Sequence, residues 1–359
     1  MKKITLAALI LGAFATSAQA QSNVTIYGIV DAGIVHESGG KDGNVTRLGS
    51  GIASASRFGF KGNEDLGNGL SAVFTLEGAV KVDTGIGGTG IFDRQAFVGL
   101  KSATLGTVTL GRQYTPFYLA LSQVADPFAA GYSGSAKNMF PTVGANTRTS
   151  NTIVYASPKF SGFSADVAYS VGEQASSNEA GRQVGAVLAY SNGPLNARLA
   201  HNSRNSDNPT AAVVADRSVS IGRNTMFAVN YDFIVAKAFF AYSDNEGLNS
   251  SAYPNNTAYT ASAVRASRDN TSMLIGATVP VGPAGTIMAS YIRKDDKESF
   301  NHDADQFAIG YSHALSKRTN VYTTFAKINN KNGASYTVGD NSEVGSGDRA
   351  ISMGVRHSF

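Results

Sequence analysis

Apolar and polar residues alternate one for one along most of this chain, and this period-two pattern restricts the possible folds more than any other feature. In the first such segment, Val24, Ile26 and Val30 share one face of an extended backbone, and Asp31 lies on the other. Alternation of this kind predicts β-strands with one apolar and one polar side. No window of the sequence shows helical spacing with caps. We therefore expect an all-β fold.

The alternation recurs often enough to predict sixteen strands, an even number. They are expected at 23–35, 53–62, 68–80, 92–101, 106–113, 148–157, 162–170, 182–192, 195–204, 222–232, 234–244, 271–279, 285–293, 304–313, 319–328 and 349–359. Short segments that favour turns, such as 62–67, connect alternate pairs of strands. The other connections are long and rich in Gly, Asn and Ser, and we expect them at 36–52, 81–91, 114–147, 171–181, 205–221, 245–270, 294–303 and 329–348. Short turns at one end and long loops at the other are typical of transmembrane antiparallel β-barrels in the outer membrane of bacteria.

The first residues of the chain are typical of an export signal. Lys2 and Lys3 precede a short apolar run, and small residues ending at Ala20 form a cleavage pattern. We expect residues 1–20 to be a cleaved signal peptide and residues 21–359 to be a single barrel domain. A transmembrane helix needs about 20 apolar residues, and no run in the chain reaches that length. Because the lipid interior satisfies no backbone polar group, only a closed barrel would let this chain cross a membrane.

Composition excludes several other classes of protein. The chain has no Cys, which rules out disulfide scaffolds, thiolate metal sites and cysteine nucleophiles. Its formal net charge of +4 is small for 359 residues, so we expect no nucleic-acid partner. The five His residues lack metal-ligand spacing, and no G-x-S-x-G motif occurs. We therefore expect no enzyme activity, no cofactor and no metal.

Several sequence segments, taken together, are characteristic of one known family. They are NVTIYGIVD (23–31), SRFGFKGNEDLGNGL (56–70), RQAFVGL (94–100), GTVTLGRQ (106–113) and the terminal GVRHSF (354–359). In combination they resemble the general diffusion porins of proteobacteria. The similarity covers essentially the whole mature chain, with the loops as the divergent parts. It implies a sixteen-stranded barrel, a homotrimer, and a third long loop folded into the lumen.

The same resemblance gives the end of the chain a second meaning. Phe359 is the terminal residue, as in the family. In that family the terminal aromatic residue is the signal read by the outer-membrane assembly machinery. Independently of this role, the alternation predicts that the last segment is one more lipid-facing strand, and the two interpretations are compatible.

Alternation also predicts which charged side chains face the lumen. If Phe58 and Phe60 point outward, then Arg57 and Lys61 point inward. By the same count, Glu77 and Asp31 face inward, and Arg112 shares the outward parity of its apolar neighbours. These assignments depend on the two-residue period of a strand, so a single β-bulge would reverse any of them.

Two more arginines are predicted to face the lumen by this count. An outward Phe97 places Arg94 inward, and an outward Ile153 places Arg148 inward. The family resemblance adds that Arg57, Arg94 and Arg148 match wall positions of its anion-preferring members.

The long connection 114–147 should narrow the pore if it folds inward. It is rich in aromatic residues and contains a single acid, Asp126, which we place at the constriction, with a loop cap before Pro127 as the alternative. Arg57, Arg94 and Arg148 would then face a loop with little negative charge, and rings of Arg or Lys favour anions. For Glu77 and Asp31 we prefer the role of local partners of the arginines.

We therefore expect a passive channel for small hydrophilic solutes and ions, weakly anion-selective, in contact with outer-membrane lipid and lipopolysaccharide. A substrate-specific channel is one alternative. The other is a structural or adhesive surface barrel, with loops 245–270 and 329–348 as the part that binds a partner.

Overall fold

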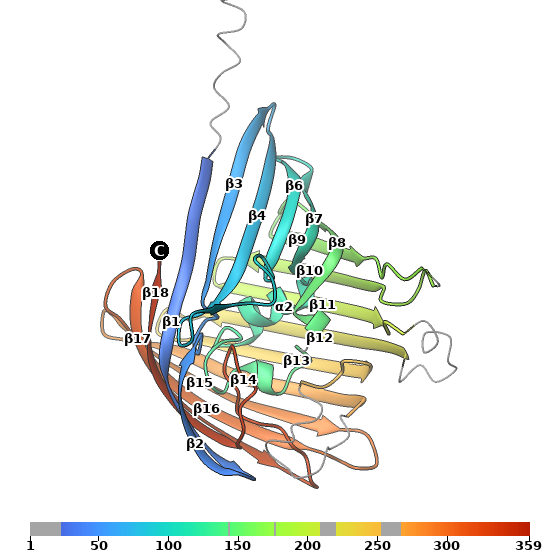
Figure 1. The fold of residues 1–359 in the computed structure, drawn as a ribbon. Coiled ribbons are helices and arrows are strands. Elements are labelled where there is room, and N and C mark those ends of the chain that lie inside the picture. The colour runs from blue at the N-terminus through green and yellow to red at the C-terminus, as the bar shows by residue number, and fades with distance from the viewer. Residues whose placement is uncertain (1–22, 143, 176, 209–219, 253–266) are drawn as a thin grey trace, which may run out of the picture.

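The protein forms one antiparallel β-barrel with little helix, seen in a computed structural model that describes residues 23–142, 144–175, 177–208, 220–252 and 267–359 (Figure 1). The expected signal peptide 1–20 lies outside the described residues. The strands are β1 (Asn23–Gly40), β2 (Gly43–Ser50), β3 (Arg57–Gly67), β4 (Leu70–Lys81), β5 (Ile86–Gly87), β6 (Gln95–Ser102), β7 (Gly106–Tyr114), β8 (Arg148–Ala156), β9 (Phe163–Ser170), β10 (Gln183–Asn192), β11 (Leu195–Asn205), β12 (Ile221–Asp232), β13 (Lys237–Gly247), β14 (Asp269–Val281), β15 (Gly285–Asp296), β16 (Ala304–Ala314), β17 (Thr319–Asn330) and β18 (Arg349–Ser358). The described helices are short: α2 (Pro116–Ala120), η1 (Leu121–Ala125), η2 (Ala136–Asn138) and η3 (Gly144–Asn146). None of them is long and apolar enough to cross a bilayer.

The barrel closes where β1 pairs with β18, from Ile29 opposite Ser358 to Ser38 opposite Arg349. The other edge of β1 pairs first with β3 and then with β2, so β2 and β3 together fill one position of the barrel. The two-residue β5 pairs only with β4 and adds no position. The ring therefore has sixteen positions, which confirms the predicted number.

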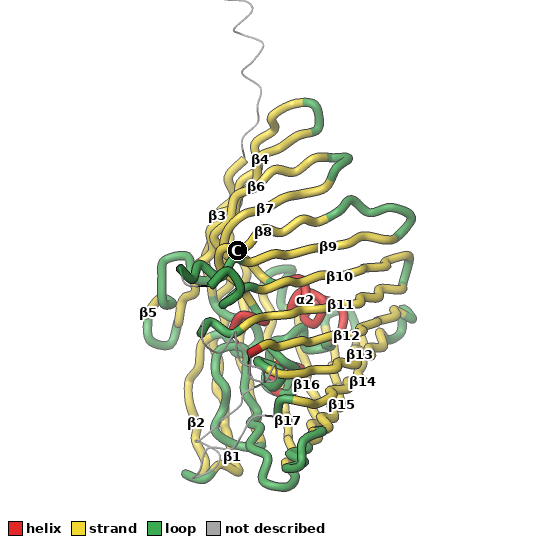
Figure 2. Tube along the Cα trace, turned by 90° about the vertical axis from the view of Figure 1, so that its right-hand side faces the viewer, coloured by secondary structure: helices red, strands yellow, loops and turns green. Residues whose placement is uncertain are grey.

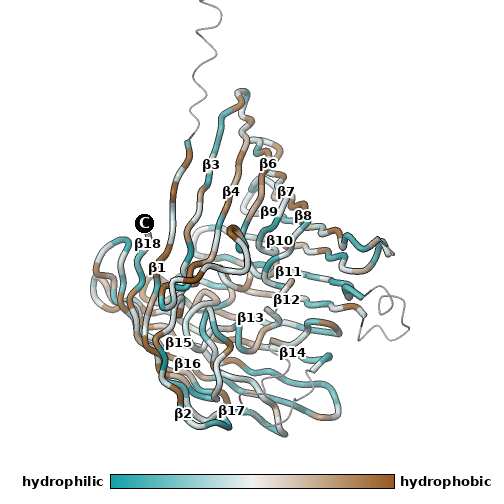
Figure 3. Tube along the Cα trace, viewed as in Figure 1, coloured by the Kyte–Doolittle hydropathy of each residue, from teal (hydrophilic) through white to brown (hydrophobic). Residues whose placement is uncertain are grey.

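The two faces of the strands differ as the alternation predicts. In β1, the side chains of Val24 and Ile26 are 59% and 64% exposed, whereas Asp31 is 0% exposed. Figure 3 shows apolar and polar residues following one another along the strands. The outer surface is therefore apolar and the inner surface polar, the arrangement of a barrel with lipid outside and water inside.

Two predicted boundaries near the start of the chain are wrong. The expected long loop 36–52 is largely strand, because β1 and β2 form a hairpin whose turn lies between Gly40 and Gly43. The expected turn 62–67 is strand as well, and the reversal occurs at Asn68–Gly69, where both residues have positive φ, 53° and 74°. Asn-Gly is the preferred pair for such a two-residue turn, and this signal was present in the sequence.

The remaining connections keep the predicted asymmetry. At one end of the barrel they are short, such as 103–105 and 193–194, and at the other they include 115–147 and 331–348. Figure 2 shows the strands from the side, with the helical turns of the connection 115–147 among them. We call residues 115–147 the inner loop and residues 331–348 the last loop.

Candidate pore constriction

The three arginines that are predicted to face the lumen lie far apart in the sequence but come together in the structure. Nε of Arg94 donates to Oε1 of Glu77 at 2.8 Å, and Nε of Arg57 lies 3.6 Å from Oε2 of the same carboxylate. Tyr114 connects the third arginine, because its hydroxyl oxygen accepts from Arg94 at 2.6 Å and from Arg148 at 2.8 Å. Two guanidinium groups thus bind one carboxylate and the third joins them through the Tyr114 hydroxyl, so the group has a formal charge of +2. We call these five residues the arginine cluster.

Arg57 reaches the cluster as predicted, since it stands opposite Ile29 and Ala79 on the inner face of β3. Arg94 reaches it for a different reason. Val98 and Leu100 are the outward residues of β6, at 58% and 52% exposed, so the assignment of Phe97 to the outer face is wrong. Arg94 lies just before β6, in irregular backbone, where the alternation does not apply.

Arg148 also joins the cluster through irregular backbone. The register between β7 and β8 shifts between Gly111 and Gln113, and Asn151 adopts a positive φ of 56° in the bulge. A bulge interrupts the two-residue period of the strand. The guanidinium of Arg148 instead stacks over the Tyr114 ring, 4.3 Å from its centroid. The planar ion suits this position because guanidinium groups stack on aromatic faces.

Lys61 extends the positive charge along β3. Its amine lies 5.3 Å from the centre of the Tyr27 ring, and the Tyr27 hydroxyl donates to Oε2 of Glu77 at 3.0 Å. Glu77 therefore binds two arginines and a tyrosine. This geometry agrees with the predicted role of Glu77 as a local partner of arginines.

The inner loop crosses the lumen and attaches to the inner face of the opposite wall. Its helix α2 lies against β10 and β11, and farther along the barrel Asn230 of β12 donates to the carbonyl of Val124 at 2.9 Å. On β15, the amine of Lys294 donates to the carbonyl of Met139 at 3.1 Å, and Ser133 reaches Ser352 of β18 at 3.2 Å. The loop therefore lines the inner face from β10 to β18, and it also reaches residues 51–56, directly before β3.

The structure assigns Asp126 to the alternative role, as a cap of the loop, and contradicts its placement at the constriction. The side chain is 3% exposed, and its carboxylate accepts three backbone N–H groups, from Phe128 at 3.0 Å and from Ala130 and Ala136 at 2.9 Å each. Burial raises the pKa of this carboxyl to about 6. Asp126 thus fastens the inner loop to itself and presents no charge toward the arginines.

The inner loop has one basic side chain, Lys137, near the arginine cluster. The amine of Lys137 donates to the carbonyl of Asn341 at 2.9 Å, and burial lowers its pKa to about 8. The charge of Asp340 raises the pKa of this amine, and the charges of Arg148 and Arg94 lower it. The one basic side chain of the inner loop therefore lies between the acid of the last loop and the arginine cluster.

Asp31 also lies outside the cluster, contrary to expectation. It is fully buried, accepts from the hydroxyl of Tyr322 at 2.5 Å, and accepts from the backbone N–H of Ser54 at 2.7 Å. Residues 51–56 interrupt the barrel position shared by β2 and β3, and the backbone N–H of Tyr132 in the inner loop donates to the carbonyl of Ile52 there. Asp31 therefore holds the interruption to which the inner loop attaches.

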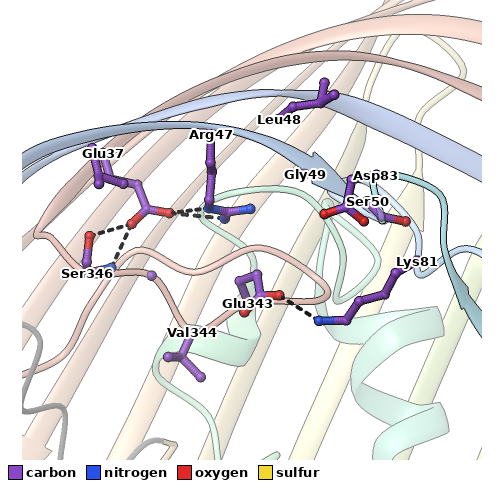
Figure 4. Close-up of a pocket in the computed structure, with 12 residues that line it drawn as sticks. Glu37, Arg47, Leu48, Gly49, Ser50, Lys81, Asp83, Glu343, Val344 and Ser346 are labelled. Carbon is purple, nitrogen blue, oxygen red and sulfur yellow. Dashed lines mark hydrogen bonds and ion pairs between the residues drawn. The ribbon is translucent and has the colours of Figure 1, made fainter. Parts of the chain in front are cut away.

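The last loop folds into the mouth of the barrel and rests on the inner loop. Residues 334–340 are buried, and the Gly339 N–H donates to Asn138 at 3.1 Å. Arg47 anchors this loop through Asp340 at 2.6 Å and Glu37 at 3.0 Å. Figure 4 shows Arg47 and Glu37 in a cavity of about 300 Å³ at the mouth. The sequence does not predict Arg47 or Lys137 as a site residue, because it predicts a loop at 36–52 and shows no strand pattern around Lys137.

We expect Arg47→Met to release the last loop. The change leaves the two buried carboxylates Glu37 and Asp340 without their cation, and breaking a buried ion pair costs about 3–5 kcal/mol. Chymotrypsin should then cut at Tyr336, which is 5% exposed in the intact protein. Lys41→Met, in the neighbouring hairpin turn, is the control, because it changes the net charge by the same amount. Equal resistance of Tyr336 in both variants would show that Arg47 does not hold the loop.

Comparisons with known proteins bear on what this lumen does. A family model described as Gram-negative porin matches residues 5–333. An outer membrane porin protein of Bordetella pertussis is 31% identical, with all of both chains aligned, and outer membrane porin protein 32 of Delftia acidovorans is 32% identical, also with all of both chains aligned. Among solved structures, an anion-selective porin from Comamonas acidovorans matches with a TM-score of 0.77 and 29% identity, over 94% of this chain and 100% of that chain.

Proposed function

Because this chain belongs to the Gram-negative porin family and is a passive outer-membrane channel, we propose that it conducts small hydrophilic solutes and prefers anions. The observation that carries the preference is the arginine cluster, in which Arg57 and Arg94 bind the single carboxylate of Glu77 and Arg148 joins them through the Tyr114 hydroxyl. A guanidinium does not lose its proton in a protein, so this charge is permanent. Fixed positive charge beside a narrow passage attracts anions and repels cations.

The position of the inner loop supports the same proposal. The loop lies against the inner face from β10 to β18, so the passage left for solutes runs beside the arginine cluster. The carboxylate of Asp126, the acid of the inner loop, accepts hydrogen bonds from the loop itself. Lys137 is the charged side chain of the inner loop that lies nearest the arginine cluster. The similar porin from Comamonas acidovorans is anion-selective, which is in line with this arrangement.

Zero-current potential in a KCl gradient tests the proposal directly. We expect the refolded mature chain in a planar bilayer to give a potential of the sign that chloride preference produces. We also expect conductance to appear in steps of three, because we propose a homotrimer. A potential of the opposite sign would place a net negative charge at the narrow zone and overturn the anion preference. Single, unlinked steps would overturn the trimer alone.

The adhesive alternative loses part of its basis. Under this alternative, the loop 329–348 binds a partner, but residues 334–340 are buried in the barrel mouth. The ends of the other candidate, 245–270, belong to β13 and β14, and residues 253–266 lie outside the described ones. Contact with lipopolysaccharide, and recognition of Phe359 by the assembly machinery, remain part of the proposal. Phe359 pairs with Gly28 through two backbone hydrogen bonds of 3.1 Å at the closure of the barrel.

A further inference from the structure

Arg356 of β18 is a further arginine on the inner face of the barrel. On the same strand, Met353 and Val355 are 54% and 50% exposed on the outer face, whereas Ser352 is fully buried on the inner face. Arg356 has the parity of Ser352, and β18 keeps one unbroken register with both of its neighbouring strands. Because no bulge interrupts the two-residue period here, the side chain of Arg356 points into the lumen.

The guanidinium of Arg356 has no partner of its own within the described part of the chain. No carboxylate there forms an ion pair with it, and its Nε is buried without an acceptor. Asp31 stands opposite Arg356 on β1, but its carboxylate is fully buried and accepts from the Tyr322 hydroxyl at 2.5 Å and from the Ser54 N–H at 2.7 Å. Because Arg356 is partly exposed although its Nε is buried, the outer end of its guanidinium faces the lumen.

Arg356 lies across one strand from the arginine cluster. Ile29 of β1 pairs with Arg57 of β3 at one edge and with Ser358 of β18 at the other. Arg356 is the inward residue next to Ser358 on β18, so β1 alone separates the strands that carry Arg57 and Arg356. Two strand spacings amount to about 10 Å. The two cations therefore border the same passage on neighbouring parts of the wall.

The inner loop borders Arg356 on another side. The Tyr132 ring of this loop packs edge-on against the Tyr322 ring, with 5.2 Å between the ring centres, and Tyr322 donates to Asp31 opposite Arg356. Burial raises the pKa of the Tyr132 hydroxyl, and the positive charge of Arg356 lowers it. The guanidinium of Arg356 therefore lies close to the inner loop, in the part of the lumen that this loop narrows.

From this arrangement we propose that Arg356 forms a second binding position for small inorganic anions in the lumen, across β1 from the arginine cluster. The outer end of its guanidinium donates to the anion, since no residue of the described chain occupies it. Conduction needs binding that is strong enough to admit an ion and divided over several positions, so that the ion can leave. With two positions, one anion leaves as the next enters. This inference rests on the proposed anion preference and assigns part of it to a further residue.

Arg356→Gln in the refolded mature chain should lower the chloride-to-potassium permeability ratio several-fold at low salt. A unit charge about 4 Å from an ion changes the occupancy of that ion about fivefold even at the dielectric constant of water. Arg356→Lys keeps the charge and should keep most of the preference. Arg349→Gln is the matched control, because Arg349 lies on the outer face of the same strand and pairs with Asp348 at 3.4 Å. Equal ratios for Arg356→Gln and Arg349→Gln would overturn the inference.

Anomalous X-ray scattering from bromide locates the anions in crystals of the refolded protein and needs no variant that folds. We expect one bromide at the arginine cluster and another within hydrogen-bond distance of Arg356, and in Arg356→Gln only the second should disappear. Bromide at the cluster but none at Arg356 would overturn this inference and leave the proposed function standing. Bromide at neither place would overturn both, and so would a zero-current potential of the unchanged protein with the sign of cation preference.

Discussion

Replacing Arg57 and Arg94 together by Gln should remove most of the chloride preference of the pore. The cluster carries a formal charge of +2, and the double variant leaves Arg148 and Glu77, which cancel. A unit charge about 4 Å from a permeating ion is worth about 1 kcal/mol even at the dielectric constant of water, which is about fivefold in relative occupancy. We therefore expect the chloride-to-potassium permeability ratio to fall several-fold, and to fall most at low salt, where screening is weakest.

Removing the acid instead of the arginines should change the chloride preference in the opposite direction. Glu77→Gln removes the only acid of the cluster and should raise the chloride preference. Glu246→Gln is the matched control, because Glu246 lies on the outer face of β13, 57% exposed. Its loss changes the net charge equally but should leave the permeability ratio unchanged. If Glu77→Gln and this control gave the same ratio, the filter would lie elsewhere in the lumen.

Folding of the double variant needs its own measurement, since Arg94 is 6% exposed and its loss leaves Glu77 with fewer partners. Adding Glu77→Gln to the double variant removes that buried charge and leaves Arg148 alone, at a formal +1. The triple variant should therefore recover part of the anion preference and all of the folding yield. A triple variant as poorly folded as the double one would mean that the arginines stabilise the barrel by packing.

The sequence predicted the fold wherever the backbone is regular. Alternation placed Arg57 and Glu77 on the inner face correctly, because β3 and β4 keep one register across that region. It placed Arg94 on the inner face only because it wrongly placed Phe97 on the outer face. The backbone before β6 is not in strand geometry, so the alternation does not apply to Arg94. No pattern in the sequence distinguishes a lumen arginine on a bulge from one on a regular strand.

The roles of the acids were harder to predict than their positions. Asp31 and Asp126 both lie inside the barrel, but each accepts hydrogen bonds from the chain itself. Which donors surround a carboxylate depends on how residues far apart in sequence fold together, such as Asp31 and Tyr322. Asp126 gave one usable signal, the following Pro127, because Asp before Pro often begins a turn.

Asp126→Ala should release the inner loop from its compact form and enlarge the pore. The substitution leaves the N–H groups of Phe128, Ala130 and Ala136 without their acceptor in a buried site. Each buried donor left unsatisfied costs about 1–3 kcal/mol. We expect a higher single-channel conductance with more noise, and a weaker chloride preference because ions then pass farther from the arginines. Asp207→Ala, an exposed acid near the barrel mouth, is the control of equal charge.

Asp126→Asn separates the charge of this group from its hydrogen bonds. Burial raises the pKa of the carboxyl from its ordinary value of 3.8 to about 6. The packed loop therefore binds a proton more tightly than the released loop, and its stability is greatest below pH 3.8 and falls as the pH rises through 6. The noise of the unchanged pore should increase over that range. In Asp126→Asn, which cannot ionise, the noise should not depend on pH there, although the amide restores only some of the lost acceptors. If the pore of Asp126→Ala conducts like the unchanged pore at every pH, the carboxylate does not hold the inner loop.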